Sequence, residues 1–125
     1  MIRQLNLSDY EVYCVLGNNP DEKNHQRKIL INVAIRIPNA VYPACISDQL
    51  DQTVCYADMA NFIDGVFAKK KFNLLEKASQ FLYDELFIYL RRCITDVHLQ
   101  QRVEIRKPSP FHDRRGDVSF VCSDW

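Results

Sequence analysis

The sequence predicts an α+β fold in which two strands, two helices and two further strands follow one another along 125 residues. Apolar residues alternate with polar ones near both ends of the chain, and they recur every three or four positions in its middle. This order favours a four-stranded antiparallel sheet with both helices on one face. The other face is then polar, and it either lies in solvent or lines a barrel that several subunits close together.

The amino-terminal part of the chain has the pattern of two strands. Residues 29–37 alternate with a period of two, which predicts one apolar face formed by Ile29, Ile31, Val33, Ile35 and Ile37. Residues 2–15 carry strand-forming side chains such as Val12 and Tyr13, and residues 17–20, Gly-Asn-Asn-Pro, supply turn chemistry between the two runs. We therefore expect a hairpin with an irregular loop.

Two amphipathic helices are expected in the middle of the chain. From residue 56 to about residue 67, apolar side chains recur with a spacing of four, as Met59, Ile63 and Phe67. Thr53 stands where it could cap the start of this helix. Residues 74–92 form the longer helix, which has basic residues in its last turn and an apolar face of Leu75, Ala78, Leu82 and Leu86.

Alternation returns in the last third of the chain. A third strand is predicted to end at Lys107-Pro108 and to place on one face Val97, Leu99, Val103 and Ile105. A fourth strand is expected over about 117–123. We expect residues 1–125 to form a single domain, because a chain of this length can bury enough apolar surface to fold without disulfides or a metal.

Composition argues against several classes of partner and cofactor. Sixteen basic and sixteen acidic residues give a formal charge of zero, so neither a nucleic-acid nor a membrane partner is expected. The five cysteines include no CxxC pair and the three histidines no HxH or HExxH arrangement, so we expect neither a disulfide framework nor a metal. The chain has neither a signal-peptide pattern nor a membrane-spanning stretch, which predicts a cytoplasmic protein.

Four polar residues at element boundaries are candidates for chemistry, and each also has a structural interpretation. Glu76 follows Asn73 by three positions, so the two could form a capping box. Glu22 lies in a charged run that would ordinarily be solvated, and Tyr56 opens a helix where an aromatic ring more often packs. Lys107 at a strand end is ordinarily a solvated charge that protects the edge of a sheet.

Four segments that contain these residues resemble the dihydroneopterin aldolase family. They are Leu16-Gly17 followed by Asp21-Glu22 and Gln26, Tyr56-Ala57 after Thr53, Phe72-Asn73-Leu74-Leu75-Glu76, and Ile105-Arg106-Lys107-Pro108. The resemblance runs through nearly the whole chain. It implies the tunnelling fold, in which subunits join their sheets into barrels, and a homo-octamer of two stacked tetramers with sites shared between neighbouring chains.

The resemblance also implies a role for each candidate. Glu76 would bind the guanidine-like edge of a pterin, with backbone groups near Leu75 and Val54 assisting. Tyr56 would come from the neighbouring subunit and relay a proton, Lys107 would act at ring N5, and Glu22 would hold and tune Lys107. In the loop, counting from Gly17 selects Glu22, whereas counting back from Gln26 selects Asp21; we prefer Glu22.

The implied activity is that of a carbon-carbon lyase of folate biosynthesis. It would split 7,8-dihydroneopterin into 6-hydroxymethyl-7,8-dihydropterin and glycolaldehyde by a retro-aldol reaction, without a cofactor. Two alternatives stay open at this point. The related dihydroneopterin triphosphate 2′-epimerase shares much of the same site, and a non-catalytic, oligomeric pterin-binding module would have the same order of elements.

Overall fold

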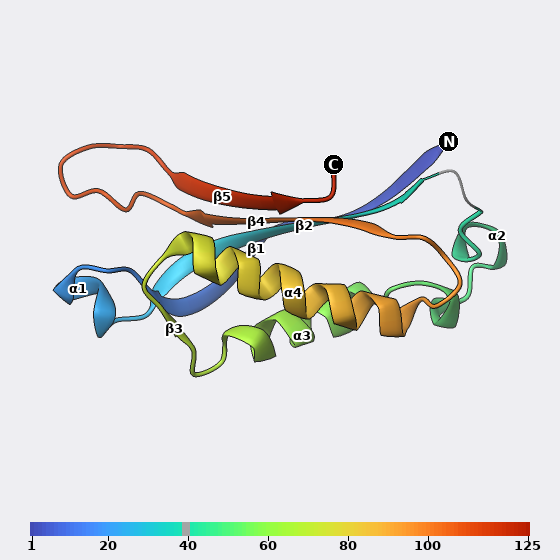
Figure 1. Cartoon of the computed structure of the whole chain (residues 1–125), viewed down its shortest axis with the longest axis horizontal. Coiled ribbons are helices and arrows are strands. Elements are labelled where there is room, and N and C mark those ends of the chain that lie inside the picture. The colour runs from blue at the N-terminus through green and yellow to red at the C-terminus, as the bar shows by residue number, and fades with distance from the viewer. Residues whose placement is uncertain (39–40) are drawn as a thin grey trace.

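The computed structural model describes residues 1–38 and 41–125 and has a curled five-stranded sheet with helices on one face (Figure 1). The strand order is β3-β1-β2-β4-β5, with β1 at Ile2–Leu16, β2 at Arg27–Pro38, β3 at Lys71–Phe72, β4 at Gln100–Lys107 and β5 at Val118–Ser123. The long helices are α3 (Tyr56–Phe67) and α4 (Leu75–Cys93). The connections contain α1 (Pro20–Lys23), α2 (Ala44–Ser47) and a 3-10 helix (Leu50–Gln52).

The predicted α+β class is confirmed, but the prediction of a wholly antiparallel, four-stranded sheet is wrong. The two-residue strand β3, which lies between the long helices, pairs in parallel with Val15 and Leu16 at the end of β1. This pairing satisfies backbone groups at the end of β1 that lie beyond the last residue paired with β2, Cys14. The short helices α1 and α2 were also not predicted, because segments of four residues are too short to show a helical period.

The core forms where the predicted apolar faces meet. The five alternate β2 residues Ile29, Ile31, Val33, Ile35 and Ile37 are at most 1% exposed. Opposite them, α4 buries a stripe with helical spacing, which consists of Leu75, Ala78, Leu82, Leu86 and Leu90. Helix α3 contributes Met59, Ile63 and Phe67. The period of two on the sheet and the near-four period on the helices therefore predicted the core faces correctly.

The two predicted helix caps are wrong. Helix α4 begins at Leu75, so Leu74 occupies the N-cap position and no side chain caps the helix. Asn73 lies one residue before the N-cap position, so it does not form the predicted capping box with Glu76. Helix α3 has Cys55 at its N-cap, and the hydroxyl of Thr53 instead forms a hydrogen bond with the hydroxyl of Tyr42.

The third predicted strand begins later than expected, so Val97 and Leu99 precede it. Gln101 takes the inward position near the start of β4 and is fully buried. Its side-chain amide donates a hydrogen bond to the carbonyl of Tyr83 in α4 at 2.8 Å, and its backbone N–H donates to Asp124 at 2.8 Å. The first bond satisfies the side-chain N–H group of this inward-facing residue, whereas its buried Oε1 has no hydrogen-bond partner within the described chain.

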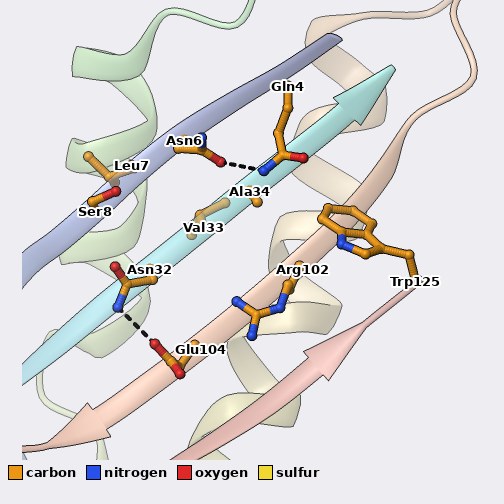
Figure 2. A pocket seen from close by; sticks show the side chains of 10 residues that line it. All are labelled: Gln4, Asn6, Leu7, Ser8, Asn32, Val33, Ala34, Arg102, Glu104 and Trp125. Carbon is orange, nitrogen blue, oxygen red and sulfur yellow. Dashed lines mark hydrogen bonds between the residues drawn. The ribbon is translucent and has the colours of Figure 1, made fainter. Parts of the chain in front are cut away.

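The face of the sheet away from the helices is polar (Figure 2). Asn32 in β2 donates a hydrogen bond to its neighbour Glu104 in β4 at 3.1 Å, and both residues line a hollow of about 370 Å³. The ring of Trp125 lies over this face, with the guanidinium carbon of Arg36 4.0 Å from the ring centroid. No helix within residues 1–38 and 41–125 is long and apolar enough to cross a lipid bilayer.

The two faces of α4 predict a contrast in stability. Leu86 is fully buried, so Leu86→Ala should lower the free energy of unfolding by about 3 kcal/mol through lost burial and a residual cavity. Ile88 on the same helix is 50% exposed, so Ile88→Ala should cost less than about 1 kcal/mol. Urea denaturation of both variants measures the contrast, and equal losses would contradict the inward assignment of Leu86.

Candidate active site

A buried ion pair joins the loop after β1 to the end of β4. The Nζ of Lys107 donates a hydrogen bond to Oε2 of Glu22 at 2.7 Å, and their side chains are only 16% and 11% exposed. Glu22 lies in α1, where the Asn19 side chain accepts its backbone N–H at 2.9 Å. The charged run is therefore not uniformly solvated, because Asp21 is exposed while Glu22 points inward to Lys107.

The ionisation of Glu22 reflects opposing effects. Burial raises its pKa, but the hydrogen bond and charge of Lys107 lower it, with further help from Asn19 and the nearby charge of Arg27. The net result is a pKa below the ordinary value for a glutamate. At neutral pH, Glu22 is consequently a carboxylate that accepts a hydrogen bond from the Lys107 ammonium group.

Gly17 allows this carboxylate to approach the backbone. A Cβ atom at position 17 would lie 2.2 Å from Cδ and 2.4 Å from Cβ of Glu22, and the φ angle of Gly17 is +156°. The backbone N–H of Gly17 donates to the carbonyl of Phe72 at 3.0 Å. The same residue therefore makes room for Glu22 and ties the Glu22 loop to the segment that leads into α4.

Leu75 and Glu76 begin α4 at this same end of the molecule. Figure 1 shows α1, β3, the start of α4 and the end of β4 gathered there. Glu76 is exposed in the first turn, where the leading backbone N–H groups have no partner within the helix. A carboxylate there can accept two parallel N–H bonds from a planar ligand.

Tyr56 and Val54 lie near the start of α3, away from Glu76. Because α3 and α4 run in opposite directions along the sheet, their first residues lie at opposite ends of the helical layer (Figure 1). Tyr56 is 69% exposed. Val54 is buried and donates its backbone N–H to the hydroxyl of Tyr42 at 3.2 Å, so its carbonyl is the backbone group left for a ligand.

One chain thus pairs Glu22 with Lys107 and places the start of α4, with Leu75 and Glu76, at the same end of the fold. Tyr56 and Val54 lie at the other end. Sequence reasoning missed Tyr42, whose hydroxyl contacts both Thr53 and Val54 and braces the segment before α3. No local pattern could have revealed it, because the contact depends on how residues 42–54 fold back. Among the described residues, no group of three or more His, Cys, Asp or Glu side chains could hold a metal ion.

Comparison with known proteins identifies the family of the chain. The family model described as FolB, dihydroneopterin aldolase, matches residues 5–123. The chain belongs to the dihydroneopterin aldolase family. A probable dihydroneopterin aldolase of Chlamydia pneumoniae is 29% identical over 120 residues, covering 96% of this chain and 87% of that protein. One of Chlamydia trachomatis is 24% identical over 123 residues, covering 98% and 96%.

Solved dihydroneopterin aldolase structures share the fold. The E. coli enzyme in complex with neopterin matches with a TM-score of 0.79 at 16% identity, covering 98% of this chain and 99% of that one. A Burkholderia dihydroneopterin aldolase bound to guanine matches with a TM-score of 0.73 at 23% identity, covering 98% and 89%. The family model and the named relatives do not favour the epimerase alternative.

The ion pair predicts a pH-dependent contribution to stability. Because the pKa of Glu22 is lowered in the folded chain, the pair stabilises the fold above the ordinary glutamate pKa of about 4.5. This contribution is lost as the pH falls through the folded-state pKa. The difference in urea midpoint between the wild type and Glu22→Gln should therefore be largest near neutral pH and should shrink below about pH 4.5. Asp21→Asn is the matched control, and a difference that does not vary with pH would contradict the pairing.

Proposed function

We propose that this aldolase-family protein cleaves 7,8-dihydroneopterin into 6-hydroxymethyl-7,8-dihydropterin and glycolaldehyde. The observation that carries the proposal is the buried Lys107–Glu22 pair, which lies at the same end of the fold as the exposed carboxylate of Glu76. A retro-aldol reaction on a pterin needs one group to orient the ring and another to move protons beside it. Glu76 and Lys107 are groups suited to these two tasks.

Glu76 is the proposed anchor for the substrate. Its carboxylate accepts two hydrogen bonds from the guanidine-like edge of the pterin, which fixes the plane and direction of the ring. Backbone groups at Leu75 and Val54 supplement this recognition. The neopterin and guanine named with the two solved family structures carry such an edge, which supports a planar ligand of this kind.

Lys107 is the proposed acid at ring N5. When N5 is protonated, the C6=N5 imine accepts the electron pair of the side-chain C1′–C2′ bond, and that bond breaks. The 2′-hydroxyl loses its proton and becomes the aldehyde of glycolaldehyde, while C1′ gains a proton and N5 releases its own. Glu22 keeps the Lys107 ammonium group beside the ring, and Tyr56 relays protons near the side chain.

Two neighbouring chains complete the proposed site. Tyr56 opens α3 and Val54 lies just before it, at the end of the molecule away from Glu76, so a second chain has to supply them. No strand in the described parts of the chain pairs with the outer edge of β5, which exposes Val118 and Phe120. Joining such edges between subunits would close a barrel, and we propose a homo-octamer of two stacked rings of four.

Substitutions at Lys107 and at Glu76 should affect the cleavage step and pterin binding separately. Lys107→Ala should abolish glycolaldehyde release while leaving pterin binding largely intact, because it removes the proton donor and retains the anchor. Glu76→Gln should weaken binding by roughly ten-fold or more, since it removes a charged acceptor. Product analysis and pterin fluorescence titration measure the two effects. Near-normal cleavage by Lys107→Ala would exclude its role, and a wild type that binds pterin without releasing glycolaldehyde would be a non-catalytic binding module.

Mixing two inactive variants should restore activity if the site is shared. In an assembly of Lys107→Ala and Tyr56→Ala chains, some interfaces combine an intact Tyr56 from one chain with an intact Lys107 from the next. Co-refolding at equal amounts should recover about a quarter of wild-type sites. Each variant refolded alone is the control, and light scattering reports the assembly. Failure to recover activity in correctly assembled mixtures would place both residues in one chain's site.

A further inference from the structure

A strongly cationic hollow adjoins the Lys107–Glu22 pair. It measures about 360 Å³ and is lined by Arg27, Lys28, Lys107, Pro108 and Pro110. None of the described residues that line it is acidic. Because the whole chain has no net charge, this concentration of positive charge is local and not part of a general basic surface.

Arg27 is a cation of this hollow that forms no direct ion pair within the described chain. It is the first residue of β2, where its backbone is held opposite Cys14 of β1, and its side chain is half-buried. Within residues 1–38 and 41–125, no carboxylate lies within ion-pair distance of its guanidinium group, and that group forms no hydrogen bond. The carboxylate of Glu22 is near enough for the charge of Arg27 to lower its pKa, but Glu22 is already bonded to Lys107. The guanidinium group of Arg27 is therefore still able to form bidentate hydrogen bonds with an anionic ligand.

Lys28 is also available to such a ligand. Its only ion pair in the described chain is with Glu11 at 4.0 Å, and both side chains are about half exposed. An exposed pair at this distance is weak and is easily exchanged for a better acceptor. Lys107 is different, because its short bond to Glu22 already neutralises it. The positive charge free to bind an anion is therefore that of Arg27 and Lys28.

We propose that Arg27 and Lys28 form an anion subsite for a phosphoryl group on the side chain of the pterin substrate. This inference rests on the proposed function, in which Lys107 stands at ring N5 beside the carbon that carries the side chain. Since Lys107 also lines the hollow, a side chain that leaves the ring next to it is directed toward Arg27 and Lys28. The substrate class is a phosphate ester of 7,8-dihydroneopterin.

The proposed reaction on such an ester leaves the phosphate bond intact. The C1′–C2′ bond breaks as before, its electron pair moves into the C6–N5 unit, and the 2′-hydroxyl proton leaves as the aldehyde forms. C1′ then takes up one proton, so no oxidant or reductant is required. The pterin product is unchanged, and the second product is glycolaldehyde phosphate in place of glycolaldehyde.

The shared pterin product allows one assay for every substrate. We would measure kcat/KM for 7,8-dihydroneopterin, its 3′-monophosphate and its 3′-triphosphate by formation of 6-hydroxymethyl-7,8-dihydropterin. The wild type should prefer a phosphorylated form, and Arg27→Gln should reduce that preference roughly ten-fold or more. Lys28→Gln, at an exposed position that tolerates substitution, should reduce it by a smaller factor. Arg92→Gln removes the same charge at the far end of α4 and should leave the preference unchanged.

The outcomes separate this inference from the proposed function. Equal kcat/KM for all three substrates, or a preference that survives both Arg27→Gln and Lys28→Gln, would overturn the subsite and leave the aldolase intact. Cleavage of none of the substrates would overturn the proposed function. Inorganic phosphate should inhibit the wild type weakly and competitively with the phosphorylated substrate. Inhibition that is equally strong in Arg27→Gln would place the anion elsewhere.

Discussion

The alternation of side chains along β2 is the constraint on which the rest of the structure depends. Five β-branched residues on one face of this central strand are almost inaccessible to water, and both long helices pack on that side. A shift of one residue in its pairing would turn the apolar face toward the polar hollow. The register of β2 with β4 also places Leu30 opposite Arg106, so Lys107, the next residue of β4, lies beside the start of β2. The core and the candidate site therefore share one register.

The Lys107–Glu22 pair has a different energetic character from that core. Taking both charges largely out of water is costly, and their attraction offsets the cost only because the contact is short and Glu22 has further hydrogen-bonding support. Apolar side chains at the two positions would stabilise the fold as well or better. The pair also lies beside a hollow that contains Arg27 and Lys28, and its position is consistent with the proton transfer that we propose for Lys107.

The antiparallel course of α3 and α4 divides the family's motif residues between two ends of one chain. This division follows from the short link through β3, which reverses the chain and ties Phe72 to Gly17. The same hydrogen bond brings the start of α4 to the Glu22 loop and leaves the start of α3 remote from it. The proposed site, which combines residues from both ends, therefore requires two neighbouring chains.

Local periodicity in the sequence by itself determined the α+β class, the order of the main elements and the buried faces of β2, α3 and α4. These features depend on residues within a few positions of one another, so the sequence pattern reports them directly. Four motif segments likewise identified the family to which the chain belongs. Only the tertiary structure decided that β3 joins the sheet, that Glu22 and not Asp21 contacts Lys107, and that Arg27 shares a hollow with Lys107. Glu22 and Lys107 are 85 residues apart in the chain. Their contact depends on sheet register, loop closure and the space left at Gly17, which no local pattern encodes.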